Sequence, residues 1–150
     1  MITAITIKSL HGHKLTIGGF GPMNVFVGKP PLPEHIVMAM AHGVADFVGD
    51  AGHWTFRLSP EEGVHPEALK PVVNELRRYT QMFVTTQSPY FLDCFEADEV
   101  FCVAQGKSGK VYADRLDHHP DAPDMTKDFM SGEIWTSVYE QWVVPAGDRT

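Results

Sequence analysis

Two carboxylates and a histidine follow a predicted strand near the middle of the chain. Glu61, Glu62 and His65 lie in the segment Ser59–Pro66. Carboxylate and imidazole groups perform general acid–base catalysis, and the active sites of α/β proteins lie where parallel strands end. The same residues also suit a solvated turn, in which Glu67 favours the N-terminus of the next helix. The residue types leave both a catalytic role and a turn open.

A second candidate is the loop that leads from the run Met23–Val27 into a predicted helix. In a strand–loop–helix unit, backbone N–H groups and the helix N-terminus can bind phosphate. That function needs glycines and a Lys-Ser or Lys-Thr pair. The segment Gly28–His35 has no glycine after Gly28, and its prolines at 30, 31 and 33 each remove an N–H donor. On residue types alone, we interpret this segment as a rigid loop that caps a helix.

Two other segments carry groups that could bind a ligand. Thr85–Tyr90 offers hydroxyls and an amide at a strand end, which could contact a ligand or cap the following helix. Further along, carboxylates and imidazoles gather within a few residues: Asp114, Asp117, His118, His119, Asp121 and Asp124. They could hold a divalent metal, but adjacent residues rarely converge on one ion. We expect no dedicated metal site there.

The elements that position these residues follow from hydrophobic periodicity and turn residues. The predicted strands are 2–7, 15–17, 23–27, 54–58, 82–86, 100–104 and 110–116. The predicted helices are 34 to about 48, 69–79 after a lead-in at 66–68, 89–95, and 133–142. Strands alternate with helices in the middle of the chain, which indicates parallel pairing. We therefore predict one α/β domain over residues 1–150: a mostly parallel sheet with flanking helices, N-terminal antiparallel strands and a C-terminal β-hairpin.

Composition restricts the function classes. The chain has 150 residues, 43% of them hydrophobic, and 12 Lys and Arg against 19 Asp and Glu give a net charge of −7. This charge argues against general nucleic-acid binding and against docking on an anionic membrane. Cys94 and Cys102 are too few for a disulfide scaffold and suit small buried groups. With no signal peptide or spanning segment predicted, we expect a cytoplasmic protein.

The same segments carry a resemblance. Ser59–Pro66 is S-P-E-E-G-V-H-P, and Val84–Asp93 is V-T-T-Q-S-P-Y-F-L-D. Together with the strands of Met1–Gly28 and the segments Phe95–Leu116 and Gly132–Trp135, they resemble ATP-binding-cassette ATPases of the RecF/SMC-like type, in the branch of the overcoming-lysogenisation-defect ATPases. In that family the matching segments are E-P-E-N-G-x-H-P after the Walker B strand and T-H-S-P at the switch strand. The resemblance implies a P-loop NTPase-like sheet, magnesium-dependent ATP hydrolysis and head-to-tail dimers around nucleotide.

This sequence differs from the family at each residue that would bind phosphate or magnesium or take part in ATP hydrolysis. Aligned without gaps, the phosphate-loop lysine falls on Glu34 and the magnesium-binding hydroxyl on His35. The Walker B acids fall on Leu58 and Ser59, and the switch histidine on Gln87. The signature motif and the helical arm have no counterpart. The vestigial positions are Gly28, Lys29, Glu34, His35, Leu58, Ser59, Glu61, His65 and Gln87.

We therefore hypothesise a non-catalytic, degenerate ATPase-like domain that acts as a protein-interaction or regulatory module, with no catalytic residue, cofactor or metal. Its expected partner is a second copy of itself or a full-length ATPase relative, docked on apolar surface of the Ile36–Val48 helix and the Trp54 region. An alternative is a nucleotide-binding protein or repurposed hydrolase using Glu61, His65 and Gln87. A third possibility is a decayed product without function, which would lack a cooperative melt.

Overall fold

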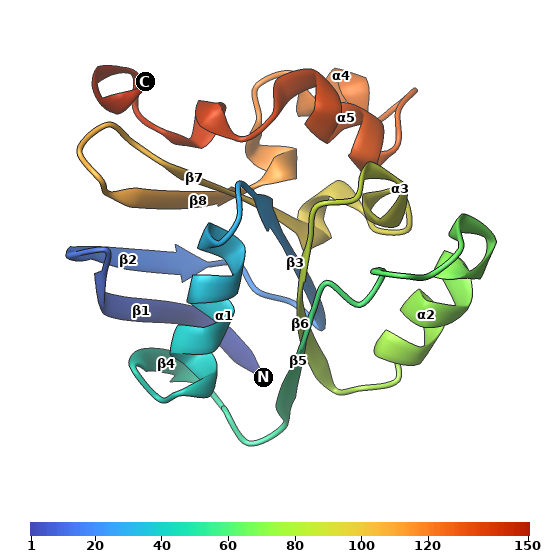
Figure 1. Ribbon diagram of the computed structural model, residues 1–150, viewed down its shortest axis with the longest axis horizontal. Coiled ribbons are helices and arrows are strands. Elements are labelled where there is room, and N and C mark those ends of the chain that lie inside the picture. The colour runs from blue at the N-terminus through green and yellow to red at the C-terminus, as the bar shows by residue number, and fades with distance from the viewer.

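A five-stranded sheet forms the centre of the protein, and a computed structural model describes all 150 residues. β3 (Met23–Gly28) lies between β6 (Gln81–Thr86) and β7 (Val100–Gln105), and β5 (Trp54–Leu58) pairs with β6. These four strands are parallel, and β8 (Val111–Arg115) closes an antiparallel hairpin with β7. The order β5-β6-β3-β7-β8 confirms the predicted α/β class, the mostly parallel sheet and the hairpin (Figure 1).

A second, antiparallel sheet contains the start of the chain. β1 (Ile2–Leu10) pairs with β2 (His13–Gly18) on one side and with β4 (Ala45–Gly49) on the other. The predicted antiparallel strands at the N-terminus are confirmed. The third strand was not expected from the sequence.

The predicted helix from Glu34 to about Val48 is wrong in its second half. α1 covers only Leu32–Ala41, and the residues that follow cross over to pair with β1 as β4. Gly43 marks the break, because its φ of +75° cannot continue a right-handed helix. The apolar residues at 44, 47 and 48 fit helical spacing, but a run this short also fits a strand. Pairing with β1 decides between the two.

The remaining helices are short. They are α2 (Leu69–Leu76), preceded by the predicted 3₁₀ lead-in Pro66–Ala68, α3 (Pro89–Leu92), α4 (Ala122–Met125) and α5 (Ser131–Val138). Further 3₁₀ turns lie at Ala97–Glu99, Leu116–His118, Gln141–Val143 and Ala146–Asp148. The helix predicted to reach Trp142 ends at Val138, because Tyr139 has a φ of +54°. No helix is both long and apolar enough to cross a membrane.

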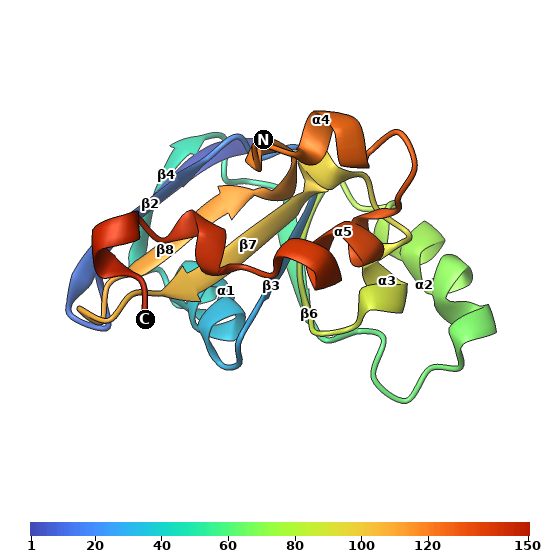
Figure 2. The ribbon, with the colours of Figure 1, turned by 90° about the horizontal axis from the view of Figure 1, so that it is seen from above.

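The parallel sheet has a hydrophobic core on each face. Phe26, Phe83 and Phe101 pack with α1 and the antiparallel sheet. Val84 and Cys102 belong to the other core, which contains the buried residues of α2, α3 and α5. Seen from above, the antiparallel sheet lies on one side of the parallel sheet, and α2 and α3 lie on the other (Figure 2). Every residue of β3 is buried, as predicted for a strand covered on both faces.

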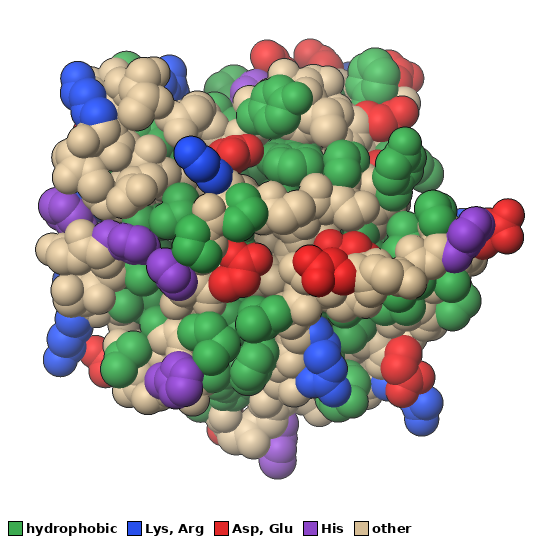
Figure 3. Space-filling model, viewed as in Figure 1, with side chains coloured by type: hydrophobic (Ala, Val, Ile, Leu, Met, Phe, Trp, Pro, Cys, Tyr) green, Lys and Arg blue, Asp and Glu red, His purple; other side chains and the backbone are tan.

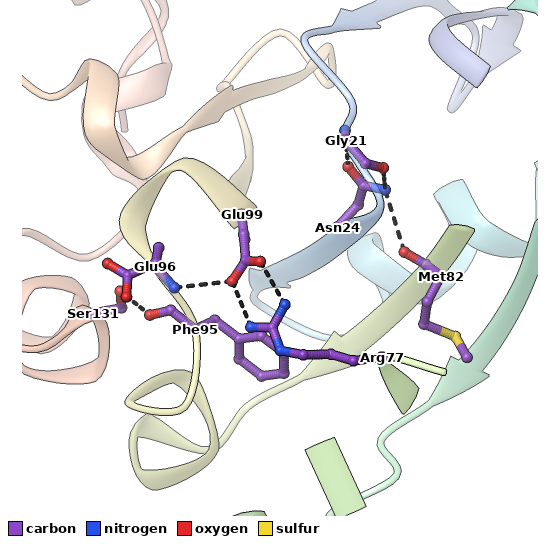
Figure 4. A network of polar contacts seen from close by, with 8 residues as sticks. All are labelled: Gly21, Asn24, Arg77, Met82, Phe95, Glu96, Glu99 and Ser131. Atoms are coloured by element: carbon purple, nitrogen blue, oxygen red, sulfur yellow. Dashed lines mark hydrogen bonds and ion pairs between the residues drawn. The ribbon is translucent and has the colours of Figure 1, made fainter. Parts of the chain in front are cut away.

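One buried side chain and one partly exposed ion pair tie these elements together. Asn24 on β3 accepts a hydrogen bond from the Gly21 amide and donates to the carbonyls of Gly21 and Met82 (Figure 4). Arg77, just after α2, makes two hydrogen bonds to Glu99, at 2.7 and 2.9 Å, and crosses to the segment before β7 (Figure 4). Such bidentate pairs fix orientation as well as adding energy. They hold the strands that end at the candidate site.

Candidate functional site

Three of the four predicted site segments meet at one edge of the parallel sheet. In the strand register, Leu58 of β5 aligns with Thr85 of β6, and Thr86 aligns with Val27 of β3. All three strands run in the same direction, so the loops after β5, β6 and β3 leave from the same carboxyl edge. This is the edge where α/β proteins bind ligands. The fourth segment, Asp114–Asp124, lies at the end of the antiparallel strand β8 and leaves the sheet at the opposite edge.

The loop between β3 and α1 offers few free N–H donors to an anion. The amide of Leu32 donates to the Lys29 carbonyl, and the amide of His35 donates to the Pro31 carbonyl. Pro30, Pro31 and Pro33 have no amide hydrogen. Lys29 is exposed and forms no ion pair with another side chain. A phosphate would find one mobile cation here instead of a cradle of amides.

Gly28, the last residue of β3, lies in close contact with β7. A Cβ atom placed on it would lie 2.2 Å from the carbonyl oxygen of Val103. Any side chain would therefore push the two central strands apart. This packing against β7 accounts for the glycine without a ligand.

The first turn of α1 places an acid at the mouth of this loop. Glu34 is half-buried, and its Oε2 atom is buried without a hydrogen-bond partner. His35 is exposed, and its Nδ1 lies 3.0 Å from Nε2 of His11 in the β1–β2 turn. A carboxylate therefore lies in the first turn of α1, at the entrance to the β3–α1 loop.

No acidic side chain is present at Leu58 or Ser59, at the end of β5, and the contacts there are made by the backbone. Leu58 is 41% exposed, and its side chain has no atom that could hold a metal. The amide of Ser59 donates to the carbonyl of Thr85 at 2.9 Å and to its hydroxyl at 3.1 Å. Ser59 thus extends the sheet by one link.

A short hydrogen-bond chain joins the loop after β5 to the end of β6. The amide of Ser88 donates to Oγ1 of Thr86 at 3.0 Å, and the Thr86 hydroxyl donates to Oε1 of Glu61 at 2.6 Å. The other oxygen of Glu61 is buried without a partner, and so is Nε2 of Gln87. With Oε2 of Glu34, these two atoms are the buried polar atoms of the edge that have no hydrogen-bond partner.

His65 does not join this group. Its Nδ1 accepts a hydrogen bond from the amide of Glu67 and caps the 3₁₀ turn that precedes α2. Its side chain is exposed. The structure supports the helix-start interpretation of this residue, and the general acid–base set of Glu61, Glu62 and His65 is not assembled.

The edge is electrostatically acidic. Figure 3 shows two groups of acidic side chains near the middle of this face, over the start of α1 and over the segment that follows β5. No three His, Cys, Asp or Glu side chains come close enough together to hold a metal ion. The unpaired oxygens of Glu34 and Glu61 can accept hydrogen bonds from a donor-bearing group. They repel phosphate.

A cavity of about 340 Å³ lies beside the β3–α1 loop. Its walls include Lys29, Pro30 and Gln105 on the sheet side and Glu140, Gln141 and Thr150 from the C-terminal segment. The sequence did not predict this covering, because Glu140 and Gln141 were placed in a helix that in the structure ends at Val138, and the residues after Trp142 have no periodicity to place them. Neither Glu61 nor Gln87 lines the cavity.

The acidic segment after β8 is used for internal contacts. His118 pairs with Asp114 at 2.6 Å, and Arg115 makes two hydrogen bonds to Asp117. The ring of His119 packs edge-on against Trp142. The hydrogen bonds to Asp114 and Asp117 therefore occupy carboxylate oxygens that could otherwise have bound a metal.

The cysteines are free thiols with different surroundings. Cys102 is fully buried in β7, and burial raises its pKa far above the ordinary thiol value. Cys94 is half-buried, and burial, followed by the charge of Asp93, raises its pKa as well. A raised pKa keeps a thiol protonated and a poor nucleophile. Neither cysteine is suited to catalysis.

The chain matches no protein-family model and no curated protein. Arguments about its function therefore depend on the geometry of the edge.

Proposed function

We propose that this protein is a non-catalytic, ATPase-like domain that acts as a protein-interaction or regulatory module. The observation that carries the proposal is the carboxylate of Glu34 at the mouth of the β3–α1 loop, half-buried and with an unpaired oxygen. A site for nucleotide phosphates needs a cation and free amides at this place. The loop instead has an acid and three prolines, and its Leu32 and His35 amides are bonded within it.

The energies support the loss of nucleotide binding. A carboxylate about 4 Å from a phosphate charge costs roughly 4 kcal/mol at an effective dielectric constant near 20. Each lost charge-assisted hydrogen bond removes about 1.5–3 kcal/mol more. Micromolar affinity amounts to only about −8.2 kcal/mol. Losses of this size remove ordinary ATP affinity, and Leu58 and Ser59 supply no acid for magnesium.

A second candidate function is nucleotide binding or hydrolysis by a rebuilt site. The observation in its favour is that Glu61 Oε2 and Gln87 Nε2 are buried and unpaired at the same sheet edge, as they would be if a ligand normally satisfied them. His65, which this alternative also needs, is used as a helix cap.

Calorimetric titration with ATP and magnesium separates the two functions. We expect no saturable heat up to millimolar ATP in the wild-type protein. Saturable heat that disappears in Glu61→Ala but persists in Glu62→Ala would overturn the proposal in favour of the alternative. Glu62 is the matched control because it is the exposed neighbour of Glu61.

As an interaction module, the protein is proposed to bind a second copy of itself or a full-length ATPase relative. The expected apolar face of α1 is not available, since Ile36, Val37 and Met40 are buried beneath the antiparallel sheet. Exposed apolar side chains are found instead on and beside β4, where Val44 is 61% and Val48 59% exposed. β4 and β5 both end their sheets with an unpaired edge, and such edges are favourable places for a partner strand.

A further inference from the structure

Two imidazole rings face each other where the β1–β2 turn meets the start of α1. Nε2 of His11 and Nδ1 of His35 are 3.0 Å apart, and the ring centroids are 5.0 Å apart. Both residues are exposed. Figure 3 shows histidine side chains next to one another between this turn and the start of α1. The pair joins residues 24 positions apart in the sequence.

The backbone of the turn does not explain the histidine. His11 and Gly12 have φ values of +52° and +81°, as in the two-residue turns that favour Asn-Gly. Gly and Asn adopt this left-handed conformation at the least cost, and His is among the few other residues enriched there. The turn therefore accepts a histidine without requiring one, and the contact with His35 is made by the imidazole ring itself.

Neither ring has another partner. The two rings make no hydrogen bond except the one between them, and neither forms an ion pair. Since both are at the surface, each ring can turn about its side-chain bonds without disturbing the core. In the hydrogen bond between the rings one nitrogen carries the hydrogen. Binding of a metal ion by both nitrogens would replace this hydrogen bond, release that proton or move it to the other ring nitrogen, and turn the two rings so that both lone pairs point at the ion.

We propose that His11 and His35 form a two-histidine site for a late divalent transition-metal ion, Cu²⁺ in preference to Ni²⁺ or Zn²⁺. Metal–imidazole bonds are about 2.0–2.1 Å long, so nitrogens 3.0 Å apart would enclose an angle of about 90° at the metal. That angle suits adjacent positions in the square-planar or tetragonal geometry of Cu²⁺ and Ni²⁺. Copper also binds tightest in the divalent series. Water fills the other positions.

Bound metal would connect the two layers of the fold. His11 lies at the tip of the β1–β2 hairpin, and His35 lies on α1, which packs between the hairpin and the parallel sheet. The ion would restrain this tip against the helix. The site needs neither nucleotide nor partner, so it is independent of the function proposed above.

The test is calorimetric titration of the full chain with Cu²⁺, together with electron paramagnetic resonance. His11→Asn keeps a residue that the turn favours, and His35→Gln keeps the helix. His53→Asn, at another exposed histidine, is the matched control. We expect one Cu²⁺ per wild-type chain, affinity at least tenfold weaker in each of the two site variants, and no change in the control. The spectrum should show two nitrogen ligands in the wild type and fewer in each site variant.

Binding in either site variant within twofold of the wild type would overturn the proposal, because a chelate needs both rings. A wild-type spectrum unchanged in the His11→Asn, His35→Gln double variant would overturn it as well, since the copper would then lie elsewhere, for example at His118 and His119. Melting curves without metal show whether the variants are folded.

Discussion

The charge of Glu61 is held at the sheet edge by a single strong contact. Its Oε1 atom accepts the hydroxyl of Thr86, whose side chain is fully buried, while its Oε2 atom has no partner. Burying a carboxylate oxygen without a hydrogen-bond partner costs free energy of folding. Thr86 is therefore more than a strand residue, because its hydroxyl connects β6 to the loop after β5 and also accepts the Ser88 amide.

Replacing Thr86 by Val keeps the shape of the side chain and removes the hydroxyl. Hydrogen bonds to charged groups are worth roughly 1.5–3 kcal/mol, so we expect the free energy of unfolding to fall by about 2 kcal/mol. In a Glu61→Ala background the same change should cost less, since only the Ser88 amide then loses its acceptor. Urea unfolding of the four proteins in this double-mutant cycle gives the coupling energy. Equal costs in both backgrounds would show that the contact contributes nothing.

At the scale of elements, the C-terminal segment is fastened by one carboxylate. Asp148 accepts hydrogen bonds from the amide and hydroxyl of Ser108 and from the hydroxyl of Tyr112. The Ser108 hydroxyl is the main reason that the pKa of Asp148 lies below its ordinary value. These contacts tie the end of the chain to the β7–β8 turn and keep the segment over the cavity beside Lys29.

Protonation of Asp148 should loosen this segment. Because the pKa of the carboxyl is lowered in the folded protein, the stabilisation it provides is present above its ordinary pKa of 3.8 and is lost as the pH falls through the lower folded value. We expect the Ser108 amide resonance to shift, and its protection against exchange relative to the intrinsic rate to fall, as the pH drops below the ordinary carboxyl pKa of 3.8. Asp148→Asn should do the same at pH 6, and Asp124→Asn, an exposed carboxylate elsewhere, should not. A Ser108 amide that is unaffected by Asp148→Asn would contradict this role.

The sequence predicted those helices and strands that depend only on residues close together along the chain. The β3 run, the Pro66–Ala68 lead-in and the start of α3 at Pro89 follow from apolar runs and proline positions, and the structure confirms them. β4 could not be predicted, because its strand identity comes from pairing with β1 some forty residues earlier. The features of the candidate site likewise include some that depend on neighbouring residues and others that depend on contacts across the fold.

The sequence segments of the candidate site were predicted correctly, because they lie at the ends of predicted parallel strands. The Thr86–Glu61 bond and the His11–His35 pair depend on distances across the fold that no periodicity encodes. Similarly, the covering of the cavity by Glu140 and Thr150 depends on an irregular tail.

At the scale of the whole molecule, both sheets end in open strands. β4 and β5 are joined by the short connection 50–53, and each has a neighbour on one side only. Val48 and Leu58 place exposed apolar surface on these strands, 59% and 41% exposed. The net charge of −7 opposes close approach of two copies, so self-association must draw on apolar burial and strand pairing.

Val48→Lys tests whether this surface joins two copies. If it does, the wild-type protein at tens of micromolar should scatter light with twice the 16.7 kDa mass of one chain, and the variant should be monomeric. A lysine on an edge strand places a charge in the apolar contact and is a common means of blocking strand addition. The fold should tolerate it, because substitutions at exposed positions usually change stability by about 0.5 kcal/mol or less. Tyr90→Lys is the control, since Tyr90 is 70% exposed on α3 and belongs to neither open strand. A monomeric wild type would contradict self-association and leave a separate ATPase relative as the proposed partner, whereas a dimer that survives Val48→Lys would place the contact on another surface.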